Sequence, residues 1–503
     1  MSEFDILLDN AVFTYVVHSK KKENLSNHIF IKNHNLYLSY SKKTEVISYE
    51  TGENAVYIIG LCVDSHGELT RYDIPKFLLS LKDINIDNII EISARFAGNY
   101  IVLVSLNGCL YAFNDATGVL PIYYCTDNIC LSSFDNIAAK TLNAIVDEKY
   151  YNIRFESDYD GAMPNDITVY KNIKLVLPNH YLDLNTLKVK RFYPIEPLTY
   201  FDEPEKILEK QIPKLQNIIK EYAKYTSMVC PLTAGWDSRT VFAFLLNTVE
   251  NIKTYTFFHK NMTNKIDDLQ IPKAMTDSVQ CSYSLVPDME PKSDFYENIV
   301  NIIGPYYYKT DMAMAYTHKK KFGDAAVVNS NISDDVGKTS KVVFLPVFCG
   351  SPKYFTTKLR NASKYTEKEM REYLKPIYNS TLKKFVYDLF GWEILCGRAL
   401  AYSHAIYSAA GIVLLDFFNC RDILNDWIQI RRSDRKKHII HKFFLSKLAP
   451  ELLKFPINPD TKFQYLRESR VLYFFATYFR FFYRKLKRPH LIENTKLALI
   501  ERV

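Results

Sequence analysis

The stretch between residues 229 and 240 combines residue types that bind phosphate groups in proteins. An apolar segment runs into Thr233, Gly235, Asp237 and Ser238. We expect a buried strand to end here, a tight turn to form at Gly235, and a helix to begin at Ser238. The start of a helix presents unpaired backbone N–H groups and the positive end of the helix dipole, and the two hydroxyls add further donors. This arrangement suits phosphate oxygens.

The acidic residue in this loop has two interpretations. A carboxylate at Asp237 repels phosphate unless it holds Mg²⁺ between itself and the phosphate oxygens. The alternative is an ordinary helix N-cap, in which Asp237 or Ser238 accepts a backbone hydrogen bond. A second segment, residues 336–339, ends like a Walker A loop, but Ile332 stands where that motif requires glycine. The loop around Gly235 is therefore the better candidate.

Alternating strands and helices are expected to position this loop. A helical pattern begins at Glu205, and apolar strands are predicted at 227–232, 252–257 and 325–329, with helical stretches between them. Such alternation favours a parallel sheet wound by crossover helices. Ligands of open parallel sheets bind beyond the carboxyl ends of the strands, which is where the loop falls. The last third of the chain is predicted to be mainly helical.

The first 195 residues show a different pattern. Short β-rich runs occur at 56–63, 100–105, 109–113, 172–176 and 181–184, and turn residues such as Asn107-Gly108 separate them. This predicts an antiparallel, layered α+β domain. The sequence thus divides into residues 1–195, residues 205–460, and a basic, aromatic tail at 461–503. That tail either packs its aromatic side chains on the preceding domain or lies on an anionic membrane surface.

Composition narrows the class of protein. The 503 residues are 48% hydrophobic and 24% charged, which is typical of a globular protein with several domains. No apolar run reaches the roughly 18 residues that span a membrane, and no secretory signal is recognisable, so we expect a cytoplasmic protein. The net charge of +8 fits a mildly basic enzyme without a specific nucleic-acid partner. Nine cysteines without a Cys-x-x-Cys pair indicate reduced thiols. His438 and His441 are predicted to be ordinary helix histidines rather than zinc ligands.

Several motifs resemble those of the asparagine synthetase family. The residues Thr233-Ala-Gly235-Trp-Asp237-Ser238 are similar to the Ser-Gly-Gly-x-Asp-Ser signature of ATP pyrophosphatases. Residues 96–100 and 114–124 resemble the glutaminase-type domain of the family, and 177–194 resembles the segment that closes that domain. The resemblance extends over roughly residues 50 to 460. It implies an Ntn-hydrolase-like N-terminal domain followed by an ATP pyrophosphatase-like domain with a helical C-terminal part.

The resemblance also implies roles for individual residues. ATP and pyrophosphate would bind at Leu232, Thr233, Gly235, Asp237, Ser238 and Phe257. Mg²⁺ would bind at Asp237 and Asp335, and the catalytic residues would be Asp335, Lys338 and Lys442. A cation at position 338 would neutralise charge that develops on pyrophosphate. A solvated turn is the alternative for Asp334-Asp335. Lys454 is an alternative to Lys442, and a solvated helix lysine is the alternative for both.

Glutamine hydrolysis is not expected. Glutamine-dependent members of the family use a cysteine after the initiator Met, and Ser2 stands there in this chain. Gly98-Asn99 occupies the region where an acid would hold the glutamine amine. The resemblance therefore implies an enzyme that adenylates a small-molecule, peptide or glycan carboxylate with ATP and transfers it to an amine. The alternative is a non-catalytic binding or regulatory protein, since Ala234, Ile332 and Ser333 replace glycines of the two motifs.

Overall fold

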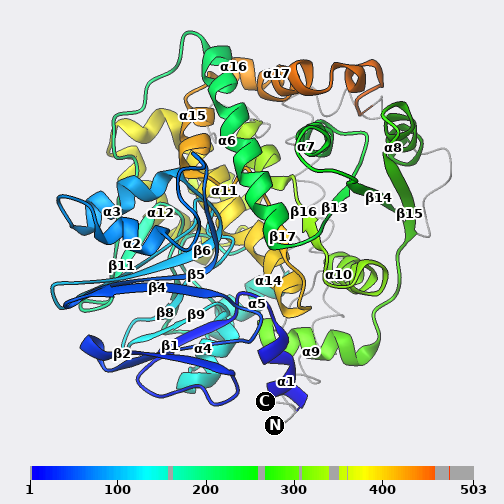
Figure 1. Ribbon diagram of the computed structural model, residues 1–503. Helices are drawn as coiled ribbons and strands as arrows, with labels where there is room; N and C mark the ends of the chain where they lie inside the picture. Colours follow the sequence, from blue (N-terminus) through cyan, green and yellow to red (C-terminus); the bar gives the residue numbers. More distant parts are fainter. Residues whose placement is uncertain are drawn as a thin grey trace.

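The computed structural model describes residues 3–156, 162–258, 267–304, 309–338, 350–359, 361–458 and 475. Within these residues, two antiparallel sheets in the N-terminal part precede one parallel sheet, and helices surround them (Figure 1). The predicted order of an antiparallel layered part and a parallel part is therefore confirmed. Ser2 and, apart from Phe475, the tail from 461 onward lie outside the described residues.

The N-terminal sheets each contain six strands, in the orders β10-β8-β9-β1-β3-β2 and β12-β11-β7-β6-β5-β4. The bounds are β1 (Tyr15–His18), β2 (Asn27–Ile31), β3 (Leu36–Tyr40), β4 (Val46–Thr51), β5 (Asn54–Asp64), β6 (Phe96–Leu106), β7 (Cys109–Asn114), β8 (Tyr123–Cys125), β9 (Cys130–Ser132), β10 (Ile173–Leu175), β11 (His180–Asp183) and β12 (Lys188–Arg191). The helices are α1 (Glu3–Asn10), η1 (Lys32–His34), α2 (Ile74–Leu79), α3 (Ile86–Ile92), η2 (Ser93–Arg95), α4 (Asp135–Leu142) and α5 (Glu148–Glu156).

The central strands explain how these sheets are layered. All eleven residues of β6 are buried. Side chains alternate between the faces of a strand, so Tyr57 and Ile59 of β5 face the core shared with the other sheet, whereas Val56 and Ile58 pack with apolar side chains of α2 and α3. Helices thus cover one face of this sheet, and the second sheet covers the other.

The C-terminal half is built on a five-stranded parallel sheet with the order β15-β14-β13-β16-β17. Its strands are β13 (Met228–Pro231), β14 (Lys253–Phe258), β15 (Ser282–Pro287), β16 (Ala326–Val328) and β17 (Leu414–Leu415). Around it lie α6 (Pro204–Tyr225), α7 (Trp236–Leu246), α8 (Asp267–Ser278), α9 (Ser293–Ile303) and α10 (Lys309–Phe322). Figure 1 shows α7 and α8 above the sheet and α10 below it. Strands 252–257 and 325–329 were predicted within one residue of β14 and β16.

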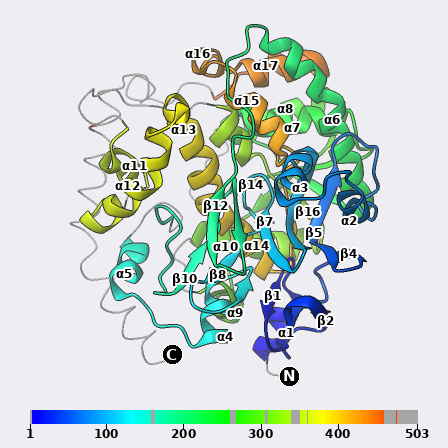
Figure 2. The ribbon, with the colours of Figure 1, turned by 90° about the vertical axis from the view of Figure 1, so that its left-hand side faces the viewer.

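Helices make up most of the remaining described chain, as predicted. They are η3 (Ser333–Gly337), α11 (Pro352–Lys358), α12 (Lys364–Tyr378), η4 (Thr381–Phe385), α13 (Val386–Leu389), η5 (Phe390–Leu400), α14 (Ala401–Ala409), α15 (Arg421–Ile428), α16 (Arg432–Arg435), α17 (Ile439–Leu448) and η6 (Pro450–Lys454). Figure 2 shows α11, α12 and α13 gathered on one side of the molecule. Two of these segments, η3 and η5, are π-helical.

The two halves share one hydrophobic core and several buried polar contacts. Arg191 from β12 forms two hydrogen bonds, of 2.5 and 2.7 Å, with the fully buried carboxylate of Glu393 in η5. Asp115 accepts a hydrogen bond of 3.0 Å from the Asn419 side chain, which also donates to the Gly98 carbonyl. Residues 1–195 and 205–460 are therefore joined by apolar packing and by buried polar contacts.

A small cavity also lies between the halves. Phe13, Leu120 and Leu414 line it, together with the polar side chains of Asn99 and His404. Burial lowers the pKa of His404 to about 3, so this imidazole is neutral at physiological pH. The residues that line the cavity come from both halves, and the loop around Gly235 is not among them.

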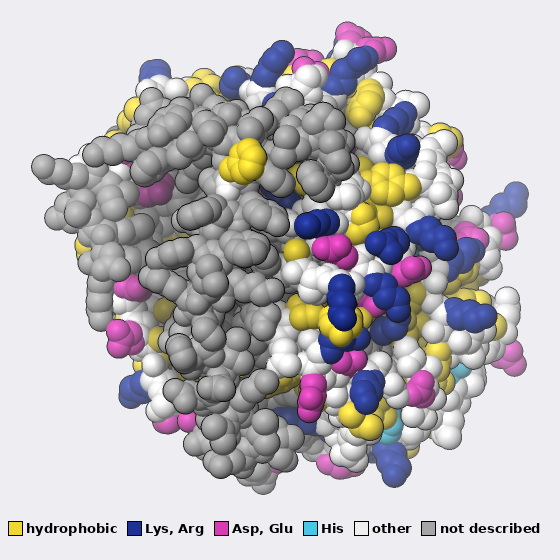
Figure 3. All heavy atoms as spheres, turned by 180° about the vertical axis from the view of Figure 1, so that it is seen from behind, with side chains coloured by type: hydrophobic (Ala, Val, Ile, Leu, Met, Phe, Trp, Pro, Cys, Tyr) yellow, Lys and Arg dark blue, Asp and Glu magenta, His cyan; other side chains and the backbone are white. Residues whose placement is uncertain are grey.

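Charges are mixed on the described surface. On the face opposite to Figure 1, Lys and Arg side chains lie interleaved with Asp and Glu over the described residues (Figure 3). Among the described helices, none has the length and apolar character needed to cross a membrane. The eight cysteines within the described ranges are free thiols.

Candidate functional site

The candidate site lies where the direction of strand addition reverses in the parallel sheet. From β13 the chain adds β14 and β15 on one side, and it then returns to add β16 and β17 on the other. Segments that leave the carboxyl ends of β13 and β16 therefore face each other, and such switch points are where open α/β sheets bind ligands. The loop 232–235 follows β13, and residues 329–338 follow β16. The fold thus brings together two motifs that are about 100 residues apart.

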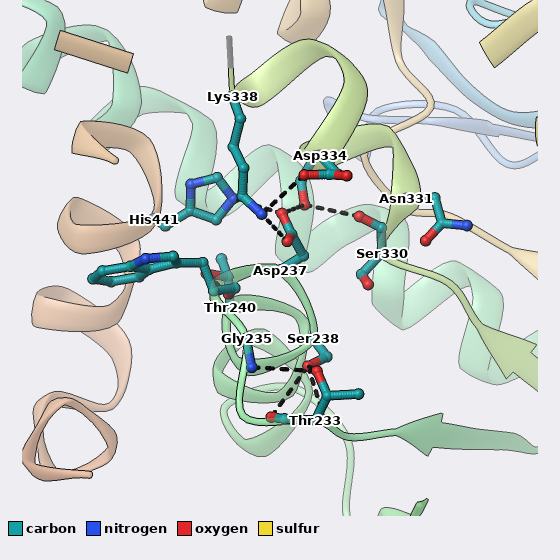
Figure 4. Close-up of polar contacts among 12 residues, drawn as sticks. Thr233, Gly235, Asp237, Ser238, Thr240, Ser330, Asn331, Asp334, Lys338 and His441 are labelled. Atoms are coloured by element: carbon teal, nitrogen blue, oxygen red, sulfur yellow. Dashed lines mark hydrogen bonds and ion pairs between the residues drawn. The ribbon is translucent and has the colours of Figure 1, made fainter. Parts of the chain in front are cut away.

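The loop after β13 is closed by its own hydroxyl groups (Figure 4). The Ser238 hydroxyl accepts a hydrogen bond of 3.1 Å from the Thr233 N–H and lies 2.8 Å from the Thr233 hydroxyl. The Gly235 N–H donates to Thr233 Oγ1 at 3.3 Å. The Ala234 N–H donates to the Asp268 carboxylate at 2.9 Å. One amide of the loop therefore already has a carboxyl oxygen of the protein as its partner.

The helix after this loop begins earlier than predicted, at Trp236 rather than Ser238. Gly235 is the N-cap residue and has an extended backbone, and no side chain caps the helix. This outcome differs from the alternative in which Asp237 or Ser238 was the cap. A Cβ atom at position 235 would lie 3.3 Å from Thr233 Oγ1, so the turn has little room for a larger residue.

Asp237 lies at the centre of a polar cluster that joins both motifs. Its Oδ2 forms an ion pair with Lys338. Its Oδ1 accepts a hydrogen bond of 2.8 Å from the Ser333 hydroxyl and lies 3.1 Å from His441 Nε2. Figure 4 shows Lys338 and His441 pointing toward Asp237 from different elements. The carboxylate is thus held by α7, by the segment after β16 and by α17.

The electrostatics of this cluster favour charged Asp237 and Lys338. Burial alone raises the pKa of Asp237, but the hydrogen bond and charge of His441 and the charge of Lys338 outweigh it, so the pKa lies well below its ordinary value. Burial lowers the pKa of Lys338, but the negative charges of Asp237 and Asp334 outweigh this effect and raise it. Each group therefore stabilises the ionised form of the other.

The two acidic residues of η3 point to different neighbours. Asp334, whose side chain is 65% exposed, forms an ion pair of 3.0 Å with Lys338. Asp335 is half-buried, and its Oδ2 lies 3.8 Å from the Cys396 thiol of η5. The family resemblance predicts Asp335 as a metal ligand together with Asp237, and as a catalytic residue. In the structure Asp334 contributes the second carboxylate beside Lys338.

A buried aspartate after β17 forms a hydrogen bond with the backbone of the segment that follows β16. Asp416 follows β17 and is fully buried. Its Oδ2 accepts the Ile332 N–H at 3.3 Å, and its Oδ1 accepts the Phe418 N–H at 3.0 Å. Burial raises the pKa of Asp416 to about 8, with a further contribution from Asp237.

Helix α17 contributes a histidine that sequence reasoning did not place in the site. His441 is 1% exposed and contacts Asp237, and its neighbour His438 stacks on the Trp236 ring with centroids 5.0 Å apart. The sequence predicts both histidines to be ordinary helix residues, and the family resemblance places only Lys442 of α17 in the site. Lys442 is exposed, and its Nζ lies 5.9 Å from the Trp236 ring centroid. Lys454, the alternative to Lys442, ends η6.

Arg239 ties the loop to the end of the described chain. Its guanidinium is fully buried and donates to the carbonyl oxygens of Ala234, Leu452, Phe455 and Pro456, at 2.7 to 3.2 Å. Burial lowers its pKa to about 10. This residue therefore fixes the 452–456 segment beside the loop.

The remaining predicted residues line the carboxyl edge of the sheet. Leu232 is buried, its N–H donates to the Tyr255 carbonyl at 2.8 Å, and its carbonyl accepts from Thr256. Phe257 is 8% exposed and packs edge-on against Tyr255. Its side chain therefore belongs to the core, and its backbone pairs with Val286 of β15.

The cluster around Asp237 supplies the number of carboxylates that Mg²⁺ bound to ATP would require. Mg²⁺ in nucleotide sites takes one or two carboxylates together with phosphate oxygens and water, and Asp237 with Asp334 supplies that number. Within the described residues there is no group of three or more His, Cys, Asp or Glu side chains that could hold a metal by itself. A metal here would therefore depend on the phosphate oxygens of its nucleotide.

The comparisons with known proteins include a distant likeness to a solved structure. No protein-family model and no curated protein matches the sequence. A solved structure of glutamine phosphoribosylpyrophosphate (PRPP) amidotransferase from B. subtilis, complexed with ADP and GMP, is similar over 65% of this chain and 78% of that chain. The sequence identity is 10% and the TM-score is 0.24, values too low to carry an argument about this chain.

Proposed function

We propose that the protein is an ATP-dependent carbon–nitrogen ligase, which adenylates a substrate carboxylate and transfers the acyl group to an amine without hydrolysing glutamine. The observation that carries this proposal is the meeting of Asp237 and Lys338 at the switch point of the parallel sheet. These residues come from the two motifs that resemble the asparagine synthetase family. We also propose that the halves correspond to its Ntn-type and ATP pyrophosphatase-type domains.

The proposed reaction has two steps. A carboxylate oxygen of the substrate attacks the α-phosphorus of ATP, which gives an acyl-adenylate and releases pyrophosphate. The nitrogen of an amine then attacks the acyl carbon, AMP leaves, and the amine loses a proton. Positioning of the reactants and neutralisation of the leaving charge would supply most of the rate enhancement.

Residues of the cluster have distinct tasks in this scheme. The loop 232–235 and the hydroxyls of Thr233 and Ser238 would bind the phosphate oxygens, in exchange for the contacts that they now make with each other. Lys338 would neutralise the departing pyrophosphate. Asp237 would hold Mg²⁺, with Asp334 close by, and the bound ion would withdraw charge from the phosphates. Asp335 is 3.8 Å from Cys396 and would support η3 rather than contact ATP.

The N-terminal half would then act as a scaffold. The Asn99 side chain, in the region where an acid would hold glutamine, is buried and donates to the Leu414 carbonyl at 2.7 Å. It is thus used for packing between the halves. We propose a small-molecule, peptide or glycan carboxylate as the substrate, with the amine supplied by a second molecule or by the same one.

An exchange assay between ATP and radiolabelled pyrophosphate tests this function. The assay would be run across candidate carboxylates with wild-type protein, with Asp237→Ala, and with Asp277→Ala as a matched control at an exposed aspartate of α8. We expect carboxylate-dependent exchange in wild type and in the control, and at least a hundredfold loss in Asp237→Ala. Equal signals in wild type and Asp237→Ala would remove the proposed site.

The second candidate function is that of a non-catalytic binding or regulatory protein, which keeps the fold but does not bind a nucleotide. Its support is that Asp237 has protein partners on both oxygens and that Asp268 occupies the Ala234 N–H. This candidate predicts no heat of binding when millimolar ATP and Mg²⁺ are titrated into the protein. Saturable binding in the micromolar range would count against it.

A further inference from the structure

The Lys338 ammonium lies between two carboxylates. It contacts one oxygen of Asp237, from the motif after β13, and one oxygen of Asp334, from the motif after β16. Two carboxylates that face one positive charge are also the arrangement that binds a divalent cation with few protein ligands. The side chains of Asp237 and Lys338 are only 18% and 17% exposed, so solvent screens this charge pair poorly.

Other contacts fix Asp237 so that its Oδ2 faces this position. Ser333 and His441 both contact Oδ1, and they come from two different elements, η3 and α17. The ring of His441 is held in turn by α17, next to His438 and Trp236. The carboxylate therefore cannot satisfy Lys338 and a metal ion with the same oxygen at the same time.

We propose, on the basis of the function above, that Lys338 acts as an internal counter-ion. In the protein without ligand its ammonium occupies the position that a metal ion would take between the two carboxylates. When a metal–nucleotide complex binds, the ammonium moves to the phosphates. Free divalent cations would then compete with a tethered ammonium and bind poorly. The metal–nucleotide complex brings its own negative charge, which gives Lys338 a new partner. Metal and nucleotide would bind together, and Asp334 would be the second carboxylate of the site.

Removal of the ammonium should change the two kinds of binding in opposite directions. We expect Lys338→Met to bind free Mn²⁺ about tenfold or more tightly than wild type, because two carboxylates lose their shared cation. The same variant should bind Mn²⁺ with α,β-methylene-ATP about tenfold more weakly, because the phosphates lose a cation. A residue with a merely structural role would weaken both.

The measurement is electron paramagnetic resonance of unbound Mn²⁺ during titration of the full chain, with and without the nucleotide analogue. Lys447→Met serves as a matched control, because it removes an exposed ion pair of 3.0 Å between Lys447 of α17 and Glu209 of α6. Circular dichroism would show whether each variant is folded. Lys338→Gln provides a second, polar variant in which the same rise in free Mn²⁺ affinity is expected.

Equal free Mn²⁺ affinity in wild type and in a folded Lys338 variant would overturn the proposal, even if ATP binds. Absence of nucleotide binding in wild type would instead contradict the proposed function. The comparison with free Mn²⁺ does not require nucleotide, so the two failures are distinguishable.

Discussion

At the scale of single residues, the chemistry of this site depends on how one carboxylate is partnered. Asp237 is ionised because His441 and Lys338 offset the cost of its burial. His441 is the partner that sequence motifs did not reveal, and its side chain is only 1% exposed. Its hydrogen bond determines which oxygen of Asp237 remains for a cation.

Substitution of His441 tests this positioning role. We expect His441→Phe, which keeps a ring but loses the N–H donor, to weaken nucleotide binding about tenfold, because a hydrogen bond to a charged group contributes about 1.5–3 kcal/mol. His441→Gln retains a donor and should recover part of the affinity. Calorimetric titration of the nucleotide measures both. Similar affinities for the Phe and Gln variants would show that the donor is unimportant.

At the scale of elements, the site depends on how the ends of neighbouring strands are joined. Asp416 links the end of β17 to Ile332, just before η3. Arg239 in α7 holds the 452–456 segment through backbone carbonyls. Both are fully buried polar residues that bond mainly to backbone, so they fix the course of the chain beside the site.

Stability should depend on pH through Asp416. Its pKa is raised from an ordinary 3.8 to about 8 in the folded protein, so between these values the native state binds more protons than the unfolded state. Its contribution therefore falls as pH rises from about 4 to about 8, with a slope that approaches about 1.4 kcal/mol per pH unit. Asp416→Asn removes this dependence.

Urea unfolding of wild type and Asp416→Asn across this pH range measures the effect. The difference in unfolding free energy should shift in favour of the variant as pH rises and should become constant above about pH 8. A difference that does not change with pH would contradict a neutral Asp416 in the native protein.

At the scale of the whole molecule, the two halves behave as one packed body. A single core cluster contains residues of both, and Arg191 and Glu393 form a buried ion pair across the interface. Asn179 and Tyr373 also donate to Glu393, so its carboxylate is fully partnered. The N-terminal half therefore stabilises the sheet that carries the site.

Loss of one member of this pair should be costly. Arg191→Met leaves Glu393 buried without its counter-ion, and we expect a loss of about 3–5 kcal/mol in unfolding free energy. The double variant Arg191→Met/Glu393→Leu should recover much of that loss, because no unpaired charge remains. Chemical denaturation of the three proteins provides the comparison. A double variant less stable than Arg191→Met would contradict this account of the interface.

The sequence by itself determined the class of each half and the strands β13, β14 and β16 of the parallel sheet. Period-two runs with Asn-Gly turns predicted the antiparallel part, and strands alternating with helices predicted the parallel sheet, because these patterns depend on local side-chain alternation. Short or exposed strands such as β15 and β17 lack that signal, so their existence followed only from pairing with neighbours.

Tertiary structure alone decided which side chains meet. Motifs predicted Asp237 and Lys338 as site residues, but only the folded η3 shows that Asp334 contacts Lys338 whereas the neighbouring Asp335 lies beside Cys396. His441 joined the site because α17 packs on α7, about 200 residues away in the sequence. Contacts between distant segments arise from burial of their apolar faces, and local sequence patterns carry little information about which faces pair.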